Sequence, residues 1–155
     1  GLLGSTLAVK NASTEKRFVI TEIEAYRGEE DLACHASKGR TNRTEIMYHK
    51  GGHIYVYLIY GMNWMLNIVA GQVDNPQAIL IRGLDVCNGP GRVGKLLKID
   101  KSYYGEDMIS SERIWIEGGE HNLRAKKIIT TPRIGIDYSG EIWKYKPWRF
   151  ILDIN

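Results

Sequence analysis

Residues 54–70 read Ile-Tyr-Val-Tyr-Leu-Ile-Tyr-Gly-Met-Asn-Trp-Met-Leu-Asn-Ile-Val-Ala, two β-rich runs separated by a short break. Aromatic and β-branched residues dominate both runs, which favours strands. The break, Gly61-Met62-Asn63, has the composition of a tight turn between antiparallel strands. The stretch therefore predicts a β-hairpin with Tyr60 and Met62 close to its tip.

Further strands are expected on both sides of this hairpin. Residues 17–26, Arg-Phe-Val-Ile-Thr-Glu-Ile-Glu-Ala-Tyr, begin β-rich and then alternate, so Ile20, Glu22, Glu24 and Tyr26 should share one face. The other runs that read as strands are 78–82, 114–117, 127–130 and 149–152.

One clear helix is expected after Asn88-Gly-Pro-Gly91, with Val93, Leu96 and Leu97 on its buried face. A short helix is also expected near Thr44–Tyr48, inside the polar, Gly-punctuated stretch 28–52. Strands in hairpins with few helices predict an α+β fold around a mostly antiparallel sheet.

Length and composition fit one globular domain and exclude a disordered or fibrous chain. The chain has 155 residues, of which 43% are hydrophobic and 25% charged. It has no run of 18 apolar residues, so we expect no transmembrane helix, and its N-terminus does not resemble a signal peptide. Cys34 and Cys87 are too few for a disulfide framework; we expect reduced intracellular thiols, with one bridge left open.

Positive charge is concentrated in two segments, 38–50 and 92–101, although the net charge is only +3. The first segment contains Arg40 and Arg43, and the second contains Arg92 and Lys95. A solvated, slightly basic surface would explain the net charge of +3, but each of the two basic segments could also face a phosphate backbone.

Two motifs fail as metal or nucleotide sites. His49 and His53 are four residues apart, but Gly51-Gly52 argues against the helix that would align them, so we expect no metal. Residues 89–95 match the first seven positions of a phosphate-binding loop, yet Leu96 stands where Ser or Thr must hold magnesium. The helix that begins after these glycines could instead contact a DNA phosphate with its N-terminus, and this alternative remains.

The carboxylates of Glu22 and Glu24 lie on one expected strand face, with Cα atoms about 7 Å apart. This spacing would suit a glycosidase pair, whereas a solvated strand face is the simpler interpretation. Tyr26 on the same face indicates a pocket wall.

The aromatic side chains of the hairpin allow two interpretations. Tyr55 and Tyr57 share a face, and aromatic stripes usually belong to a core. Tyr60 has the opposite parity and lies near the turn, beside basic loops, which suits a wedge between stacked bases.

Several blocks of the sequence together resemble the alkyladenine (3-methyladenine) DNA glycosylase family. They are Ile20–Tyr26, Cys34-His35, Tyr55–Met62, Ala78–Arg82, Asn88–Gly91, Arg133–Ile136 and Pro147–Phe150. The resemblance covers nearly the whole chain in order. It implies one compact domain over residues 1–155, with a curved sheet and a protruding hairpin.

The resemblance also implies an activity, which is excision of a damaged, alkylated or deaminated purine that has been flipped out of duplex DNA. Glu24 matches the general base that activates water, and the enzyme should be monofunctional and need no cofactor. The residues that match the base pocket and its floor are Tyr26, His35, Tyr57, Asn67, Arg82 and Ile134. The faces of Tyr26 and Tyr57 should attract a cationic base.

DNA contacts follow from the same resemblance and from the basic clusters. Tyr60 matches the residue that fills the gap left in the base stack, with Met62 beside it. Arg40 and Arg43 match a DNA-contacting loop, to which the helix start adds Arg92 and Lys95. We expect a monomer that binds double-stranded DNA with damaged purines and no membrane, acting inside the cell: in the cytoplasm of a bacterium or the nucleus of a eukaryote.

Two departures and two alternatives remain. The family has a longer N-terminal lead-in and a longer connection near 83–87, so both are expected to be shortened or missing here. A non-catalytic nucleic-acid-binding module would not need Glu24. A carbohydrate hydrolase using Glu22 and Glu24 would give no role to Tyr60 or to the Arg40–Arg43 loop.

Overall fold

The computed structural model describes residues 1–119 and 126–154. Its strands are β1 (Thr6–Asn11), β2 (Thr14–Arg27), β3 (Ile54–Ile59), β4 (Asn63–Val69), β5 (Gln77–Leu84), β6 (Cys87–Asn88), β7 (Ile114–Glu117), β8 (Ile128–Thr131) and β9 (Arg149–Leu152). The α-helices are α1 (Pro90–Leu96) and α2 (Gly140–Lys144), and the 3₁₀-helices are His35–Lys38, Glu45–Tyr48, Lys101–Tyr103 and Asp137–Ser139.

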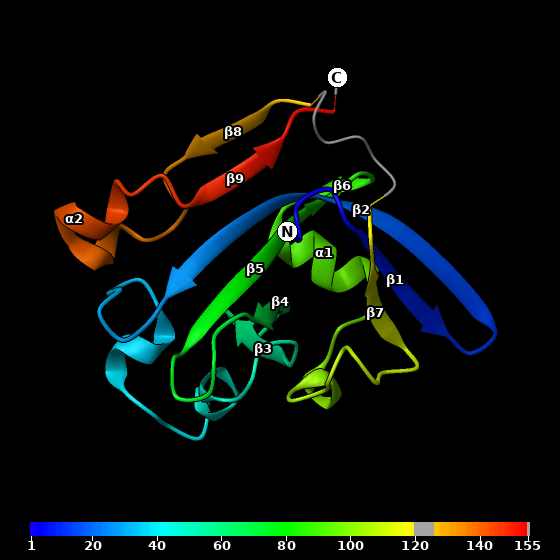
Figure 1. Ribbon diagram of the computed structural model, residues 1–155, viewed down its shortest axis with the longest axis horizontal. Coiled ribbons are helices and arrows are strands. Elements are labelled where there is room, and N and C mark those ends of the chain that lie inside the picture. Colours follow the sequence, from blue (N-terminus) through cyan, green and yellow to red (C-terminus); the bar gives the residue numbers. More distant parts are fainter. Residues whose placement is uncertain (120–125, 155) are drawn as a thin grey trace.

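Strand β2 organises the sheet. It has 14 residues and arches across the whole molecule (Figure 1). Its first half pairs with β1, from Asn11↔Thr14 to Thr6↔Val19. Its second half pairs with β5 along one edge and with β9 along the other. The residues near the end of β2 therefore lie between two neighbouring strands.

The strand order is β3-β4-β5-β2-β1-β7, with β6 on β5 and the pair β8–β9 on β2. Every ladder between these strands is antiparallel, and short helices and turns connect them. The curled antiparallel sheet with few helices confirms the α+β prediction. The β3–β4 hairpin is also confirmed, because Ile54↔Ile68 to Ile59↔Asn63 pair in register.

Hydrophobic side chains of the hairpin alternate between two cores, as the period of a strand requires. Ile54 and Val56 belong to the main core, which α1 covers with Val93 and Leu97. Tyr55 belongs to a smaller core on the opposite face, under the 28–52 segment. Leu96 was expected among the buried helix positions, which is wrong, since α1 ends there and its side chain is 39% exposed.

One expected face of β2 is interrupted. Ile20 packs in the main core, away from the face that carries Glu22 and Glu24. Pairing with β5 is irregular between Ile20 and Ile23, and such an irregularity re-aims side chains locally. The prediction that Ile20 shares their face is therefore wrong.

The glycines of the 89–95 motif have a packing role. A Cβ at Gly94 would lie 2.1 Å from the carbonyl oxygen of Trp64 on β4, and a Cβ at Gly91 would lie 3.2 Å from the side chain of Asn63. Helix α1 therefore approaches the first residues of β4 closely, next to the tip of the β3–β4 hairpin. In the described ranges, neither helix has the length and apolarity needed to cross a bilayer.

We expect Gly94→Ala to lower the free energy of unfolding by about 1–3 kcal/mol, because the new methyl group forces α1 away from β4. Urea denaturation of the purified protein measures this loss. Gly118→Ala is the matched control, since a Cβ there meets no atom within 4 Å. Equal stabilities of the two variants would contradict the close helix–strand contact.

Candidate active site

Glu24 lies in the centre of the sheet, between β5 and β9. Its neighbours in register are Leu80 on β5 and Arg149 on β9, and Leu80 in turn pairs with Asn67 on β4. Residues that pair across antiparallel strands point to the same face, so Glu24 and Asn67 share one face of the sheet. The Glu24 side chain is fully buried.

Hydrogen-bond donors hold both oxygens of the Glu24 carboxylate. The Tyr26 hydroxyl donates to Oε2 over 2.7 Å, and the backbone N–H of Ile134 donates to Oε1 over 2.7 Å. The Arg82 guanidinium lies 3.6 Å from Oε1. Each oxygen can accept a second hydrogen bond, so the carboxylate could still receive one from a water molecule.

Glu22 has a different environment from Glu24, although the two share a face. Its Oε1 accepts hydrogen bonds from Nε of Arg82 and Nε of Arg149. Arg82 therefore bridges the two carboxylates. Glu22 is engaged by two guanidinium groups and leaves Glu24 as the carboxylate of this pair that faces aromatic side chains.

Four aromatic side chains gather near Glu24. The rings of His35 and Tyr57 meet edge to face with centroids 4.5 Å apart, and Tyr55 lies 5.5 Å from Tyr57. The Tyr55 hydroxyl and Nδ1 of His35 share a hydrogen bond of 2.8 Å. Tyr26 packs with Tyr57 against the small core that contains Tyr55, and its hydroxyl bonds to Glu24. The structure thus brings Tyr26, His35 and Tyr57 together, as the site prediction requires.

Burial keeps the titratable groups of this cluster neutral at pH 7. Burial, followed by the nearby Glu24 charge, raises the pKa of Tyr26 far above its ordinary value and that of Tyr57 to about 12. Burial, Arg43 and Lys38 lower the pKa of His35 to about 4. Tyr26 therefore remains a phenol that can donate to Glu24, and His35 remains a neutral imidazole.

The structure adds a buried ion pair that the sequence did not indicate. Asp31 and Arg133 form two hydrogen bonds of 2.6 and 2.9 Å, and both side chains are fully buried. Arg133 also donates to the carbonyl of Ala25, and Asp31 accepts from the backbone N–H groups of Arg27 and Ala33. Arg133 immediately precedes Ile134, so the pair positions the amide that contacts Glu24.

The hairpin tip and helix α1 carry four of the six residues expected to contact DNA. Tyr60 and Met62 are 89% and 69% exposed at the tip of the β3–β4 hairpin. Tyr60 has a positive φ of 51°, an uncommon backbone conformation for an aromatic residue. Arg92 and Lys95 are exposed on α1, which contacts Asn63 and Trp64 next to the tip of the same hairpin.

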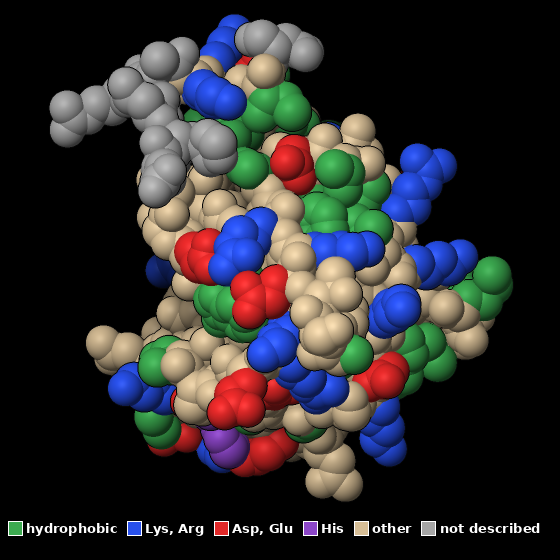
Figure 2. Space-filling model, turned by 90° about the vertical axis from the view of Figure 1, so that its right-hand side faces the viewer, with side chains coloured by type: hydrophobic (Ala, Val, Ile, Leu, Met, Phe, Trp, Pro, Cys, Tyr) green, Lys and Arg blue, Asp and Glu red, His purple; other side chains and the backbone are tan. Residues whose placement is uncertain are grey.

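Arg40 and Arg43 differ although they lie three residues apart. Arg40 forms ion pairs with Glu45 and Asp74 and stacks on Tyr48. Arg43 lies with its guanidinium carbon 5.2 Å from the centroid of the Tyr57 ring, at the aromatic cluster. On the face drawn in Figure 2, Lys and Arg side chains are interspersed with acidic and apolar ones, so the sum of charge does not mark a binding face there.

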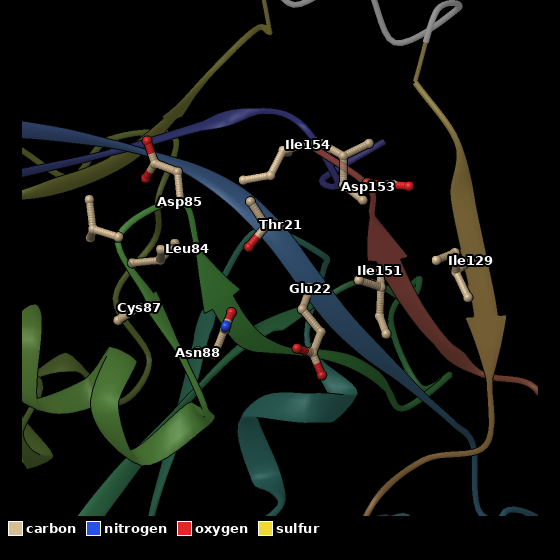
Figure 3. A pocket seen from close by; sticks show the side chains of 12 residues that line it. Thr21, Glu22, Leu84, Asp85, Cys87, Asn88, Ile129, Ile151, Asp153 and Ile154 are labelled. Atoms are coloured by element: carbon tan, nitrogen blue, oxygen red, sulfur yellow. The ribbon is translucent and has the colours of Figure 1, made fainter.

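A cavity of about 620 Å³ is lined by Glu22, but by none of the residues predicted for the base pocket or for DNA contacts. Figure 3 shows Thr21 and Glu22 of β2 between the β5–β6 turn, with Asp85 and Cys87, and the pair Ile151 and Ile129 of β9 and β8. Leu84 pairs with Cys87, so the connection near 83–87 is a tight turn. A hollow of about 290 Å³ lies beside the aromatic cluster and is lined by His35, Arg43 and Tyr138 among others.

Metal and thiol chemistry have little support in the described ranges. His, Cys, Asp and Glu side chains do not gather there in groups of three that could hold a metal ion. Cys34 and Cys87 are free, and burial raises the pKa of Cys34 to about 12. Cys34 is therefore a protonated thiol at pH 7, without the activation that a nucleophile needs.

The sequence model of the methylpurine-DNA glycosylase family matches residues 1–87 and 84–155. The chain belongs to this family. The match covers the whole chain in two stretches that meet at the β5–β6 turn. The family predicted from the sequence blocks is thus confirmed.

Relatives agree with this assignment. The chain is 41% identical to a protein of Borreliella afzelii, with 99% of this chain and 88% of the relative aligned. It is 38% identical to a protein of Methanocella arvoryzae, over 96% and 82% of the two chains. A protein of Psychrobacter cryohalolentis is 43% identical over 81% and 69%. All three have 3-methyladenine DNA glycosylase in their names.

We expect Asp31→Asn to lower the free energy of unfolding by about 3–5 kcal/mol, because it leaves the buried Arg133 charge unpaired. Urea denaturation measures the loss, and failure of the variant to fold would agree with it. Glu117→Gln is the control, since it removes an equally well-bonded partner of Arg17 from an exposed pair. Similar losses in both variants would contradict the structural role of the buried pair.

We expect the stability of the wild type to fall by about 2–3 kcal/mol through His35 as the pH drops from about 6.5 to about 4. In this window the unfolded chain protonates His35 and the folded chain does not, so protons favour unfolding. Urea denaturation at a series of pH values measures the slope. His35→Asn should have a shallower slope in this window, and an unchanged slope would show that His35 titrates alike in both states.

Proposed function

We propose that the chain is a DNA base-excision repair glycosylase that acts on a damaged purine flipped out of double-stranded DNA. The observation that carries the proposal is the environment of Glu24: a fully buried carboxylate with a donor on each oxygen, beside an aromatic cluster. Burying a carboxylate costs free energy unless hydrogen bonds or cations compensate it, and such groups are common at functional sites. Membership of a DNA glycosylase family supports the same activity.

The proposed reaction is hydrolysis of the N-glycosidic bond with Glu24 as the general base. Glu24 accepts a proton from a water molecule, whose oxygen forms a bond to C1′ of the sugar as the bond from C1′ to the purine nitrogen breaks. The electron pair of that bond leaves with the base. The negative Glu24 also stabilises the positive charge that develops at the sugar. An abasic site and a free base result.

The flipped base is proposed to lie among Tyr26, His35 and Tyr57. Aromatic faces stack on any purine, and the neutral His35 adds no charge to the pocket. Asn67 is proposed to disfavour guanine through its exocyclic amine. Its amide is held in place by the carbonyls of Tyr55 and Met65 and is 3% exposed. Arg82 forms the floor, and Ile134 helps to hold the attacking water.

Tyr60 is proposed to fill the gap that the flipped nucleotide leaves in the base stack, with Met62 beside it. The tip of the β3–β4 hairpin exposes both side chains, and the positive φ of Tyr60 is a conformation that costs about 1–3 kcal/mol. Exposed apolar wedges of this kind can separate stacked bases. Neither Tyr60 nor Met62 packs in the protein core.

Phosphate contacts are proposed for Arg43, Arg92, Lys95 and Arg40. The first three form no ion pair with a carboxylate in the part of the chain that the structure describes. Arg40 would have to exchange Glu45 and Asp74 for a phosphate. The enzyme is proposed to act as a monomer, without a cofactor, in the compartment that contains the genome.

The two alternatives predict different behaviour. A non-catalytic binding module would recognise damaged DNA and leave the base attached. A carbohydrate hydrolase would use Glu22 as the partner of Glu24, but two guanidinium groups hold Glu22. No lysine contacts the Glu24 carboxylate among its described partners, so the reaction is proposed to proceed without a covalent imine.

The test is single-turnover base release from duplexes that carry one hypoxanthine or one methylated purine, with alkali revealing abasic sites. We expect the wild type to produce abasic sites, and Glu24→Gln to bind the same duplex but release base about 10²–10⁴-fold more slowly. Tyr60→Ala should slow base release by about tenfold or more, because a stacking contact is lost.

Glu22→Gln is the matched control, since it changes the neighbouring carboxylate on the same face and should retain measurable base release. Binding without base release in the wild type would favour the non-catalytic module. An enzyme–DNA adduct trapped by borohydride would overturn the monofunctional mechanism.

A further inference from the structure

Both aromatic walls of the proposed pocket already have an arginine over them. The guanidinium carbon of Arg133 lies 4.8 Å from the Tyr26 centroid, and that of Arg43 lies 5.2 Å from the Tyr57 centroid. The negative face of an aromatic ring attracts a cation, and a second cation near the same ring meets the repulsion of the first. The rings therefore attract a cationic base less than bare tyrosines would.

The two arginines differ in how their charge is compensated. Arg133 is paired with Asp31 inside the protein, so this stack is neutral overall. Glu22 and Glu24 are balanced by Arg82 and Arg149. The described residues provide no carboxylate in an ion pair with Arg43, whose side chain is exposed. Of the two arginines over these rings, Arg43 is thus the one whose charge is uncompensated.

Arg40 shows what the compensated arrangement looks like in the same loop. Its guanidinium carbon lies 5.0 Å from the Tyr48 centroid, a geometry close to that of Arg43 on Tyr57. Glu45 and Asp74 neutralise it, and Tyr48 is buried in the smaller core. The described part of the 28–52 segment therefore provides the arginines of these two arginine–tyrosine stacks, and of the two, the stack at the proposed pocket has an arginine without a carboxylate partner.

We propose that Arg43 sets the balance between cationic and neutral damaged purines, because its uncompensated guanidinium opposes a positive charge on a base at Tyr57. This inference rests on the proposed function, and it keeps Arg43 over Tyr57 rather than on a phosphate, which would compensate its charge. Methylation at N3 or N7 leaves a purine positively charged, whereas hypoxanthine and ethenoadenine are neutral. Arg43 therefore weakens the binding of the cationic methylated purines at Tyr57 and hardly changes the binding of the neutral ones.

The reach of the Arg43 charge into the cluster supports this assignment. Arg43 contributes to lowering the pKa of His35 and opposes the upward shifts of the pKa values of Tyr55 and Tyr57. One cation thus acts on three side chains of the cluster. A charged base among these side chains would experience the same field.

The experiment compares single-turnover base release from duplexes with one 7-methylguanine or one hypoxanthine, at mildly acidic pH where the methylated ring keeps its positive charge. We expect Arg43→Gln to raise the ratio of the 7-methylguanine rate to the hypoxanthine rate by about five- to twentyfold. Arg43→Lys keeps the charge and should stay within about threefold of the wild-type ratio.

Arg40→Gln is the matched control, and its ratio should stay within about twofold of wild type whatever its effect on DNA binding. If Arg43→Gln slows both reactions by the same factor, Arg43 acts on the DNA backbone alone and the inference is overturned. If the wild type releases neither base, the proposed function itself fails. Thermal unfolding and affinity for undamaged duplex, measured on each variant, separate a folding or backbone defect from altered selectivity.

Discussion

The buried ion pair between Asp31 and Arg133 joins segments that lie 102 residues apart in the sequence. Two charges inside a protein are stabilised when their mutual geometry is good and when further hydrogen bonds engage their other polar atoms. Here Asp31 accepts backbone N–H groups from the end of β2 and from the loop before His35, and Arg133 donates to Ala25 of β2, although its Nε has no hydrogen-bond partner among the described residues. The pair thereby connects three parts of the chain that contribute to the site.

Glu24 depends on this connection. Its two donors come from different segments, Tyr26 on β2 and Ile134 on the loop that follows β8, and the second can meet the carboxylate only if that loop is held against β2. Arg133 adjoins Ile134 and also lies over the rings of Tyr26 and Trp148. Donors that are fixed before the substrate arrives need no reorganisation during the reaction, which is the physical advantage of such a site. The main core and α1 support the same sheet from its other face.

Local patterns in the sequence predicted the strands well and the contacts between distant segments poorly. Strong β-rich runs at 114–117 and 149–152 became β7 and β9 with the expected limits, and the hairpin tip with Tyr60 lies where the Gly-containing break placed it. Ile20 and Leu96 were assigned to the wrong surroundings because an irregular strand pairing and an early helix end are not visible in periodicity. The same limitation hid Asp31 and Arg133, since no spacing rule relates partners so far apart.

In the aromatic cluster, too, some features could be predicted from the sequence and others only from the fold. Family resemblance and strand parity brought Tyr26, His35 and Tyr57 to one place, but they suggested bare aromatic faces for a cationic base. The arginines over those faces come from the 28–52 loop and from residue 133, and only the folded arrangement reveals them. Likewise, the glycines of residues 89–95 resembled a phosphate loop in sequence, and in the structure they allow α1 to pack on β4.

The proposed role of the Glu24 carboxylate is to face the positive charge that develops at the sugar. Its most direct test is the affinity of the protein for a duplex with a cationic pyrrolidine in place of the target sugar, compared with a duplex that has an uncharged tetrahydrofuran there. The wild type should prefer the cationic duplex, and Glu24→Gln should lose most of that preference while binding the uncharged duplex as before. An equal preference in both proteins would show that Glu24 does not face the reacting sugar.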